Sequence, residues 1–570
     1  MIFISILIFI VAMALPSLKF NISSILLTRI TSIILFYSGV LAFNAFYIQS
    51  IGLGIGIYSG LFHVTTISQQ LDIFILLIGS LILIPRPGII EYIKTNGIKS
   101  GNIIHTEILS GLGDKYSLIV LFSTLGSTLL LSSSDLLSMY LSIELQSFGV
   151  YILATLFKES RLATSAGLKY FLLGGFSSCL ILLGSGLVYF YTGLTGLDSI
   201  YSLISSSTNE SITQGSTLGI VIIFVGFLFK VSAAPLHSWA PDVYDQSPSI
   251  ITIWLTIMPK IAIFIFLLDL FIGSTLWNNT SIISLTSLRL GSYDALKTLL
   301  LLSSLFSLVI GTIVGLAQSK IKRLFAYSTI SHVGFMLLAL AINSESSVES
   351  LIFYIIQYSI TNLNAFLIIL ALGYLNFFNK LNTDTAKTTF KKGVYSDSRN
   401  IENIDIRFIT ELKGQFMSNP LLSLSLTICL FSMAGIPPFI GFFSKQMVLY
   451  SAIQNGYYFM SIVGIIVSVI SGSYYLKIVR ILFTDSLLSE TKETKETKET
   501  KETKETPQYL LNDKNKPFVK INDNYSVSYY ITSFHSFLIS TLTLIILLFI
   551  FKPSLLLNST QLLSLSIFNC

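Results

Sequence analysis

The sequence predicts an all-α polytopic membrane protein with about 14 transmembrane helices. Of the 570 residues, 52% are hydrophobic and only 11% are charged, whereas a soluble globular protein carries about 25% charged residues. The apolar segments are near-continuous for about 20 residues, the length that crosses a hydrocarbon core as a helix. The strands of an outer-membrane barrel would instead alternate over about ten residues. The composition therefore excludes a soluble enzyme, a disordered protein and a nucleic-acid-binding protein.

Fourteen apolar segments are the predicted spans. In chain order they are residues 2–16, 24–47, 71–86, 115–133, 136–157, 165–194, 216–236, 249–273, 296–318, 323–343, 349–377, 419–452, 457–484 and 529–551. The spans and their connections divide the chain into five regions: 1–114 with three helices, 115–273 with spans 4–8, 296–484 with spans 9–13, the charged low-complexity loop 485–528, and 529–570 with the last span and a tail.

The charges of the connecting loops predict an orientation. Short loops on the side that is not translocated collect Lys and Arg. Loops after odd-numbered spans hold basic pairs such as Lys158 with Arg161 and Lys320 with Lys322. The loop after the second span, residues 48–70, holds no Lys or Arg. Both termini are therefore expected on the side that faces away from the basic loops.

Two polar insertions are expected on the basic side. Residues 378–418 form a mixed-charge loop, and residues 490–506 repeat Glu, Thr and Lys every third position. Thr is a weak helix former, so we expect the repeat to be a solvated tether, with a docking arm as the alternative.

Six titratable residues lie inside predicted spans or beside their interruptions: Glu144, Lys169, Lys230, Lys260, His332 and Lys445. A charge near the bilayer centre costs about 2.5–3.5 kcal/mol on insertion scales, so each of these residues requires a reason. For Lys169, near the start of its span, snorkelling to the interface is the alternative to a functional role. For His332 the alternative is a neutral, hydrogen-bonded core residue.

Two of the lysines adjoin predicted helix breaks. Pro235 follows Lys230 by five residues, and Pro437 with Pro438 precedes Lys445. Proline removes a backbone hydrogen bond and frees carbonyl groups, which is tolerated in a membrane only where protein or water satisfies them. Broken helices at corresponding places in two halves of a chain indicate an ion pathway.

The chemistry of these residues favours proton transfer. A lysine removed from water exchanges its proton more readily, and a nearby carboxylate such as Glu144 restores its affinity for that proton. Moving the pair together or apart would therefore make the lysine hold or release a proton. Sodium or potassium transport would require clustered carboxylates, and only one clearly central carboxylate was found.

We expect no metal or cofactor in this chain. Its cysteines, Cys179, Cys429 and Cys570, lack metal-ligand spacing. Its five histidines show no pairing typical of a haem site. Gly174 and Gly175 are interpreted as helix-packing residues, because no strand precedes them to build a phosphate-binding loop.

Six segments together resemble the antiporter-like membrane subunits of respiratory complex I: MYLSIELQSFGVYIL, GLKYFLLG, FKVSAAPLHSWAPDVY, MPKIAIF, IKRLFAYSTISHVGF and AGIPPFIGFFSK. The resemblance covers most of residues 115–480. It implies fourteen helices that contain two inverted five-helix repeats, about 115–273 and 296–484, each with one broken helix. The two charged insertions depart from the family pattern.

The resemblance also implies residue roles. Glu144 and Lys230 match the ion pair of the family, Lys260 its central relay and Lys445 its distal lysine. Lys169 and His332 match further members of the same axis. The Lys at position 445 favours the subunit 2 branch over subunit 4, which has Glu there. The implied function is proton translocation in NADH:ubiquinone oxidoreductase, coupled to quinone reduction elsewhere in the complex.

Partners, cofactors and location follow from the same resemblance. NADH, FMN, iron–sulfur clusters and ubiquinone would be bound by other subunits, with no redox chemistry in this chain. Expected partners are other membrane-arm subunits, neighbouring antiporter-like subunits and lipids, without nucleic acid. The expected location is the mitochondrial inner membrane, with both termini on the intermembrane-space side and the basic loops in the matrix.

Three alternatives stay open at this point. The chain could be a subunit of a multisubunit cation/proton antiporter, or a sister antiporter-like subunit 4 or 5 of the same complex. The third alternative is a structural scaffold without an ion path. The presence of Glu144 and the buried lysines argues against this alternative.

Overall fold

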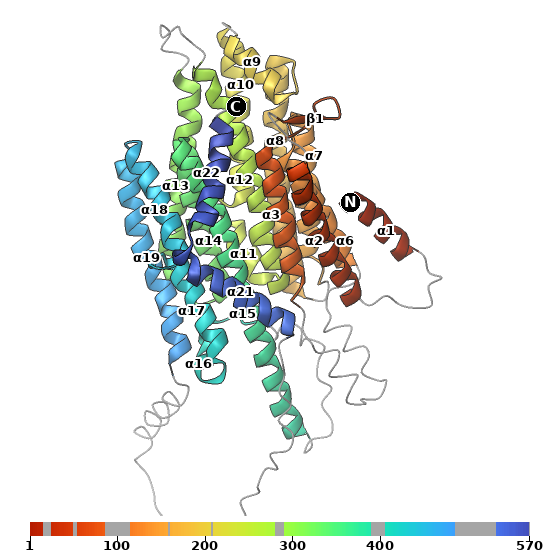
Figure 1. The fold of residues 1–570 in the computed structure, drawn as a ribbon, viewed down its shortest axis with the longest axis vertical. Helices are drawn as coiled ribbons and strands as arrows, with labels where there is room; N and C mark the ends of the chain where they lie inside the picture. The colour runs from red at the N-terminus through yellow and green to blue at the C-terminus, as the bar shows by residue number, and fades with distance from the viewer. Residues whose placement is uncertain are drawn as a thin grey trace, which may run out of the picture.

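The computed structural model describes residues 1–14, 24–48, 54–85, 115–157, 160–206, 209–279, 290–388, 405–484 and 532–568. In this part of the chain, eleven helices are long and apolar enough to cross a membrane, and three shorter apolar helices accompany them. Each of the fourteen predicted spans contains a helix, and most of the helices run along the long axis of the molecule (Figure 1). The prediction of an all-α polytopic membrane protein is confirmed.

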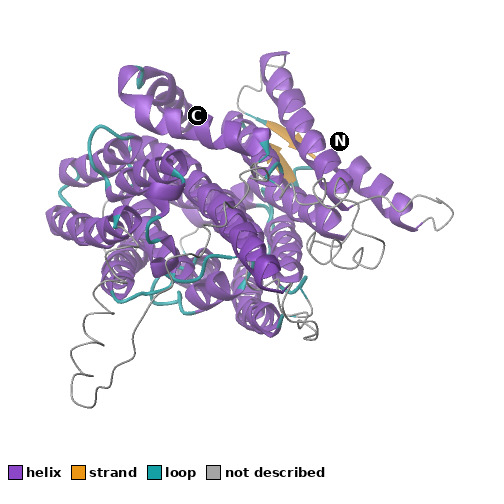
Figure 2. Cartoon of the chain, turned by 90° about the horizontal axis from the view of Figure 1, so that it is seen from below, coloured by secondary structure: helices purple, strands orange, loops and turns teal. Residues whose placement is uncertain are grey.

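The N-terminal region holds helices α1 (Ile2–Ala14), α2 (Ser24–Ile48) and α3 (Thr66–Leu83). A short antiparallel hairpin, β1 (Ile55–Ile57) and β2 (Phe62–Val64), connects α2 to α3 and was not predicted (Figure 2). The backbone N–H of His63 in β2 donates to the Ser132 carbonyl at 2.7 Å, which anchors the hairpin to the residue that follows α6 (Lys115–Leu131).

The first five-span repeat comprises α6 (Lys115–Leu131), α7 (Leu136–Ala154), α8 (Arg161–Thr192), the broken pair α10 (Glu210–Val231) and α11 (Trp239–Gln246), and α12 (Ser249–Asn279). A short helix, α9 (Leu197–Ser206), joins α8 to α10. The fourth span is interrupted between residues 231 and 239, around the predicted Pro235.

The second repeat has the same order: α13 (Leu290–Leu316), α14 (Ile321–Ile342), α15 (Glu345–Thr388), the broken pair α17 (Pro420–Ala434) and α18 (Ile440–Gln454), and α19 (Tyr458–Phe483). A single-turn helix, α16 (Gln415–Ser418), precedes α17. Because five is an odd number of spans, the first repeat ends on the face opposite to the one where it begins. The second repeat therefore starts from that opposite face and is inverted relative to the first. Its break again falls in the fourth span, at the predicted prolines.

The C-terminal region adds one helix that was not predicted. Helix α21 (Ser533–Leu548) packs against α15 and α17, and α22 (Ser554–Phe568) then runs along α15 and α3. In Figure 1 the C-terminus lies towards the end of the molecule that also carries α9 and the hairpin. The repeat 490–506, residues 389–404 of the insertion and the basic residue Lys158 lie outside the described residues.

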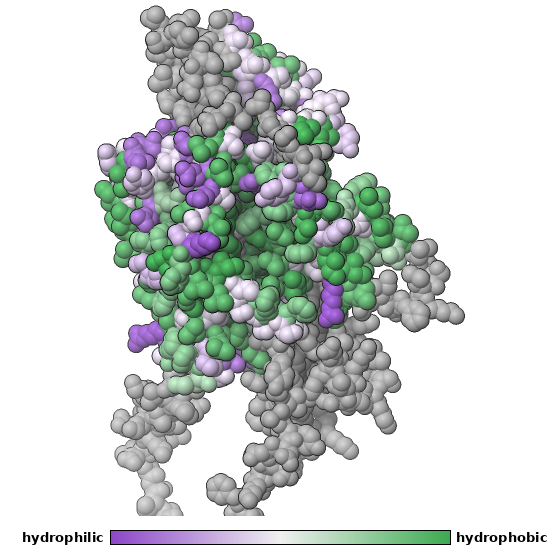
Figure 3. Space-filling view, in the orientation of Figure 1, coloured by the Kyte–Doolittle hydropathy of each residue, from purple (hydrophilic) through white to green (hydrophobic). Residues whose placement is uncertain are grey.

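The core of the molecule lies along α12, α14 and α15, which are buried over most of their length. Helices α8 and α19 instead expose large apolar side chains, including Phe171, Phe176 and Ile466. Apolar residues cover much of the described surface in Figure 3. Such a surface suits lipid or neighbouring membrane subunits rather than water. Two of the buried helices, α12 and α14, carry Lys260 and His332.

Candidate functional site

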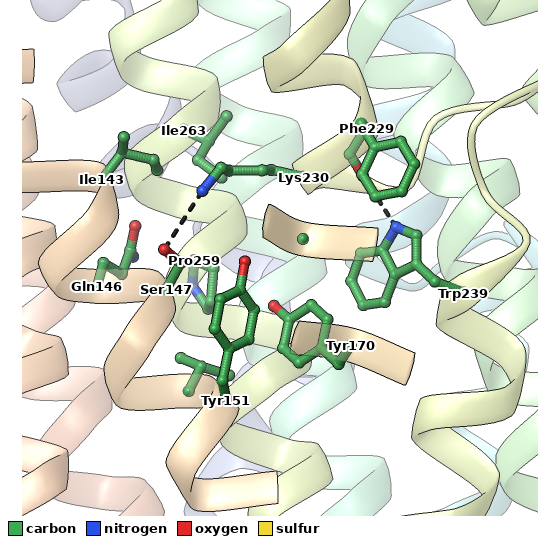
Figure 4. Close-up of a pocket in the computed structure, with 12 residues that line it drawn as sticks. Ile143, Gln146, Ser147, Tyr151, Tyr170, Phe229, Lys230, Trp239, Pro259 and Ile263 are labelled. Atoms are coloured by element: carbon green, nitrogen blue, oxygen red, sulfur yellow. Dashed lines mark hydrogen bonds between the residues drawn. The ribbon is translucent and has the colours of Figure 1, made fainter. Parts of the chain in front are cut away.

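The first helix break positions Lys230 in the interior. Helix α10 ends one residue after it, at Val231, and the chain turns through Ser232 in the left-handed region (φ 66°). Trp239, the first residue of α11, donates its indole N–H to the Phe229 carbonyl at 2.9 Å (Figure 4). The break therefore satisfies a freed backbone carbonyl internally, as a membrane interior requires.

Lys230 and Glu144 form an ion pair in which Lys230 is buried and the Glu144 side chain is 13% exposed. The Lys230 Nζ lies 3.3 Å from Oε1 of Glu144 and also donates to the hydroxyl groups of Ser147 at 3.3 Å and Ser178 at 3.0 Å. The partners come from α7 and α8, so three helices converge on one ammonium group. The sequence predicts this pair, and the structure brings the two residues together.

Lys260 lies in α12 directly after Pro259 and is 3% exposed. Its ammonium group makes no hydrogen bond within the described residues. It faces two aromatic rings instead, with its Nζ 5.8 Å from the ring centres of both Tyr244 and Tyr358. Cation–π contacts of this kind stabilise a buried cation by about 2 kcal/mol.

His332 lies buried in α14 between tyrosines of the second repeat. Its Nδ1 is 2.7 Å from the hydroxyl of Tyr354, and its Nε2 is 3.4 Å from the hydroxyl of Tyr475. The imidazole ring also lies 5.8 Å from the ring of Tyr358, the residue that faces Lys260. This geometry is compatible with a relay and also with a hydrogen-bonded core histidine.

The second helix break positions Lys445. Its Nζ donates to the carbonyl oxygens of Met433 and Ala434, each at 2.9 Å, at the end of α17. Gly435 follows with φ 85°, and a Cβ atom there would lie 2.9 Å from the Lys445 side chain. The carbonyls freed by the break thus bind the lysine itself. The ammonium group also lies 5.7 Å from the ring of Phe335, which stacks on Tyr354.

Lys169 lies apart from these contacts. Its side chain is 50% exposed and pairs with Asp242 of α11 at 3.1 Å. Arg323 of α14 binds the other carboxylate oxygen of Asp242 at 2.7 Å. This placement matches the snorkelling alternative, and the structure does not join Lys169 to the buried groups. We call Glu144, Lys230, Lys260, His332 and Lys445 the buried ionisable row.

Comparison with known proteins gives the family. Residues 133–471 match the model described as NADH:quinone oxidoreductase/Mrp antiporter, TM. This chain belongs to that family. The match includes both helix breaks and every member of the buried ionisable row.

Relatives within this family resemble the chain over most of its length. NADH-ubiquinone oxidoreductase chain 2 of Rhizopus oryzae is 47% identical over the whole of both chains. Chain 2 of Oenothera berteroana is 35% identical over 65% of this chain and 67% of its own length. NADH-quinone oxidoreductase subunit N of Pelagibacter ubique is 33% identical over 79% and 82%. The predicted resemblance to complex I antiporter-like subunits is confirmed.

Solved structures of the family share the fold. A chain of respiratory complex I from Thermus thermophilus superposes with a TM-score of 0.64 at 23% identity, covering 98% of this chain and 99% of that one. A chain of the Mrp complex from Dietzia sp. gives a TM-score of 0.69 at 16% identity, covering 100% and 96%. Both are chains of complexes.

The sequence did not point to the aromatic residues that contact Lys260 and His332. Tyr354 and Tyr358 are four residues apart and therefore share one face of α15, and that spacing was the available signal. Tyr244 belongs to the quoted AAPLHSWAPDVY stretch. For Tyr475, which contacts His332, the surrounding sequence gave no signal of that contact.

A second missed feature is an ionic junction around Asp405, which lies within the insertion 378–418. Its carboxylate accepts from the backbone N–H of Ser249 at 3.0 Å, from the Ser249 hydroxyl at 2.8 Å and from Lys322 at 2.5 Å. Burial raises the pKa of Asp405, but the Lys322 charge and the Ser249 donors outweigh it and hold the pKa below its ordinary value. The junction ties this segment to the starts of α12 and α14.

Proposed function

We propose that the chain translocates protons as a membrane-arm subunit of a mitochondrial NADH:ubiquinone oxidoreductase. The supporting observation is the buried ionisable row: a carboxylate, three ammonium groups and an imidazole that span both repeats. Aromatic rings contact Lys260, His332 and Lys445, and the second helix break supplies two carbonyl acceptors to Lys445. The full-length relative named chain 2 supports membership of this complex rather than of a cation/proton antiporter.

The contacts suggest how the row operates. Lys230 holds its charge because Glu144 and two hydroxyl groups surround it; separating it from Glu144 would leave a buried charge without a counterion, which is strongly unfavourable. Lys260 has only aromatic faces, so its charge has the fewest direct partners in the row. Lys445 has two carbonyl acceptors. A proton would therefore reside on Lys230 or on Lys445, and it would pass between them through Lys260 and His332.

The remaining assignments extend the same proposal. NADH, FMN, iron–sulfur clusters and ubiquinone would be held by other subunits, so this chain would supply no redox chemistry. Its partners would be adjacent membrane-arm subunits and lipids. The basic loops would face the matrix, with both termini on the intermembrane-space side. Lys169, paired with Asp242, would lie at the margin of the relay.

Gentle solubilisation tests the assignment to a complex. We expect the chain to migrate with NADH-oxidising activity on a native gel, and proton pumping in that complex to be lost in Lys230→Met. Migration in an assembly without NADH oxidation, but with cation/proton exchange in vesicles, would identify an antiporter subunit instead.

A further inference from the structure

The interior beside Lys230 contains a buried amide without a role in the row. Gln146 lies on α7, two residues after Glu144, and is 2% exposed. Neither its Oε1 nor its Nε2 has a hydrogen-bond partner in the described part of the chain. An amide left unpaired in the interior is costly, so native proteins almost always supply a partner.

The space next to this amide is a small cavity. Its volume is about 20 Å³, and its walls include Gln146, Lys230, Tyr151, Trp239 and Pro259. Figure 4 shows Gln146 beside Ser147, with Lys230 above and the Tyr151 ring below. A cavity of this size holds about one water molecule and excludes larger ligands. Ammonium, hydroxyl and amide groups around it give a water the two to four polar partners it needs.

The backbone fixes where the amide lies. Gly126 of α6 packs against α7, and a Cβ atom there would lie 2.5 Å from the backbone nitrogen of Gln146. This close approach holds the Gln146 backbone against a neighbouring helix. The wall of the cavity also includes Pro259, and Lys260 is the next residue of α12. The cavity is therefore lined both by Lys230 and by the segment that carries Lys260.

We propose that Gln146 is a positioning residue that binds water between Lys230 and Lys260. Its amide both donates and accepts, so it can orient a water molecule that has its own donor and acceptor groups. In a transfer, an N–H bond of Lys230 breaks as a new O–H bond forms on the water. The water then releases a different proton towards the amine of Lys260, and is itself unchanged. This inference rests on the proposed function of the row.

Three substitutions separate the amide from the shape of the side chain. Gln146→Leu and Gln146→Met remove both polar groups, and Gln146→Asn retains them on a shorter side chain. Proton pumping and NADH oxidation would be measured per assembled complex, so that a change in assembly does not affect the comparison. We expect about a tenfold loss of pumping in the apolar variants, the factor for one hydrogen bond, and substantial recovery in Gln146→Asn. Equal losses in all three variants would indicate a packing role and overturn the proposal.

Wild-type and Lys230→Met complexes complete the test. We expect density for water beside Gln146 in a cryo-EM map that resolves other buried waters, and a dry cavity in such a map would overturn the proposal. If Lys230→Met abolishes pumping while Gln146→Leu pumps normally, the relay stands and the role of Gln146 is wrong. If Lys230→Met pumps normally, the proposed function itself fails.

Discussion

The ammonium group of Lys260 lies 5.8 Å from the ring centre of Tyr358. Lys260 belongs to the first repeat and Tyr358 to α15 of the second, so this contact joins the two repeats at the centre of the row. The same ring lies 5.8 Å from His332. Its hydroxyl is 3.3 Å from the Thr256 carbonyl, which fixes the ring in place.

Replacing Tyr358 tests whether the ring carries this connection. Tyr358→Phe keeps the aromatic face and loses the hydroxyl, whereas Tyr358→Leu loses both. Because a buried cation–π contact contributes about 2 kcal/mol, we expect Tyr358→Leu to slow pumping by at least about tenfold and Tyr358→Phe by much less. Proton uptake per assembled complex is the measurement. Identical rates in the two variants would show that the ring face is not required.

Glu144→Gln tests the ion pair. The amide is nearly isosteric with the carboxylate, and Ser147 and Ser178 remain as acceptors for Lys230. We expect the complex to assemble while pumping falls about tenfold or more, since removing a counterion from a buried charge costs about 3–5 kcal/mol. Glu345→Gln, at the exposed start of α15, is the matched control. Loss of assembly in Glu144→Gln alone would make the pair structural.

The predictable features were those set by local chemistry. The length of the apolar segments predicted the spans, because the thickness of a bilayer fixes helix length. The proline positions predicted both breaks, because proline removes a backbone hydrogen bond. Helix α22 was missed because Asn558, Ser559, Thr560 and Gln561 interrupt its apolar pattern. The environments of Lys260 and His332 depend on which faces of distant helices meet. A single sequence does not encode that pairing in any local pattern.

The Asp405 junction gives a pH-dependent prediction. Because the pKa of Asp405 is lower in the folded chain than its usual value of 3.8, the carboxylate stabilises the fold at all pH values above the unfolded-state pKa. That contribution is lost only as the pH falls below about 4, through the folded-state pKa. We expect Asp405→Asn to lower the thermal stability of the complex by a constant amount from pH 8 to pH 5.

Thermal inactivation of wild type and variant over a pH series measures this difference. The side chain of Asp405 is 27% exposed, so we expect a loss of about 1–3 kcal/mol, as for a charged hydrogen-bond partner. Asp198→Asn, at an exposed position in α9, should show no loss. A difference between wild type and Asp405→Asn that grows as the pH falls from 8 to 5 would contradict the assignment.

Lys445 gives the sharpest test of proton release. The carbonyls of Met433 and Ala434 accept from its ammonium group, and they would accept equally from a guanidinium group. Lys445→Met should abolish redox-coupled proton transfer, and quinone reduction should fall with it because electron flow is coupled to pumping. Lys445→Arg should not restore either rate, since arginine stays protonated and cannot release a proton. Lys477→Met, at an exposed position of α19, controls for loss of a lysine from the same repeat. Wild-type pumping in Lys445→Arg would show that the site needs only a fixed positive charge, because the carbonyl cradle alone would then account for the lysine.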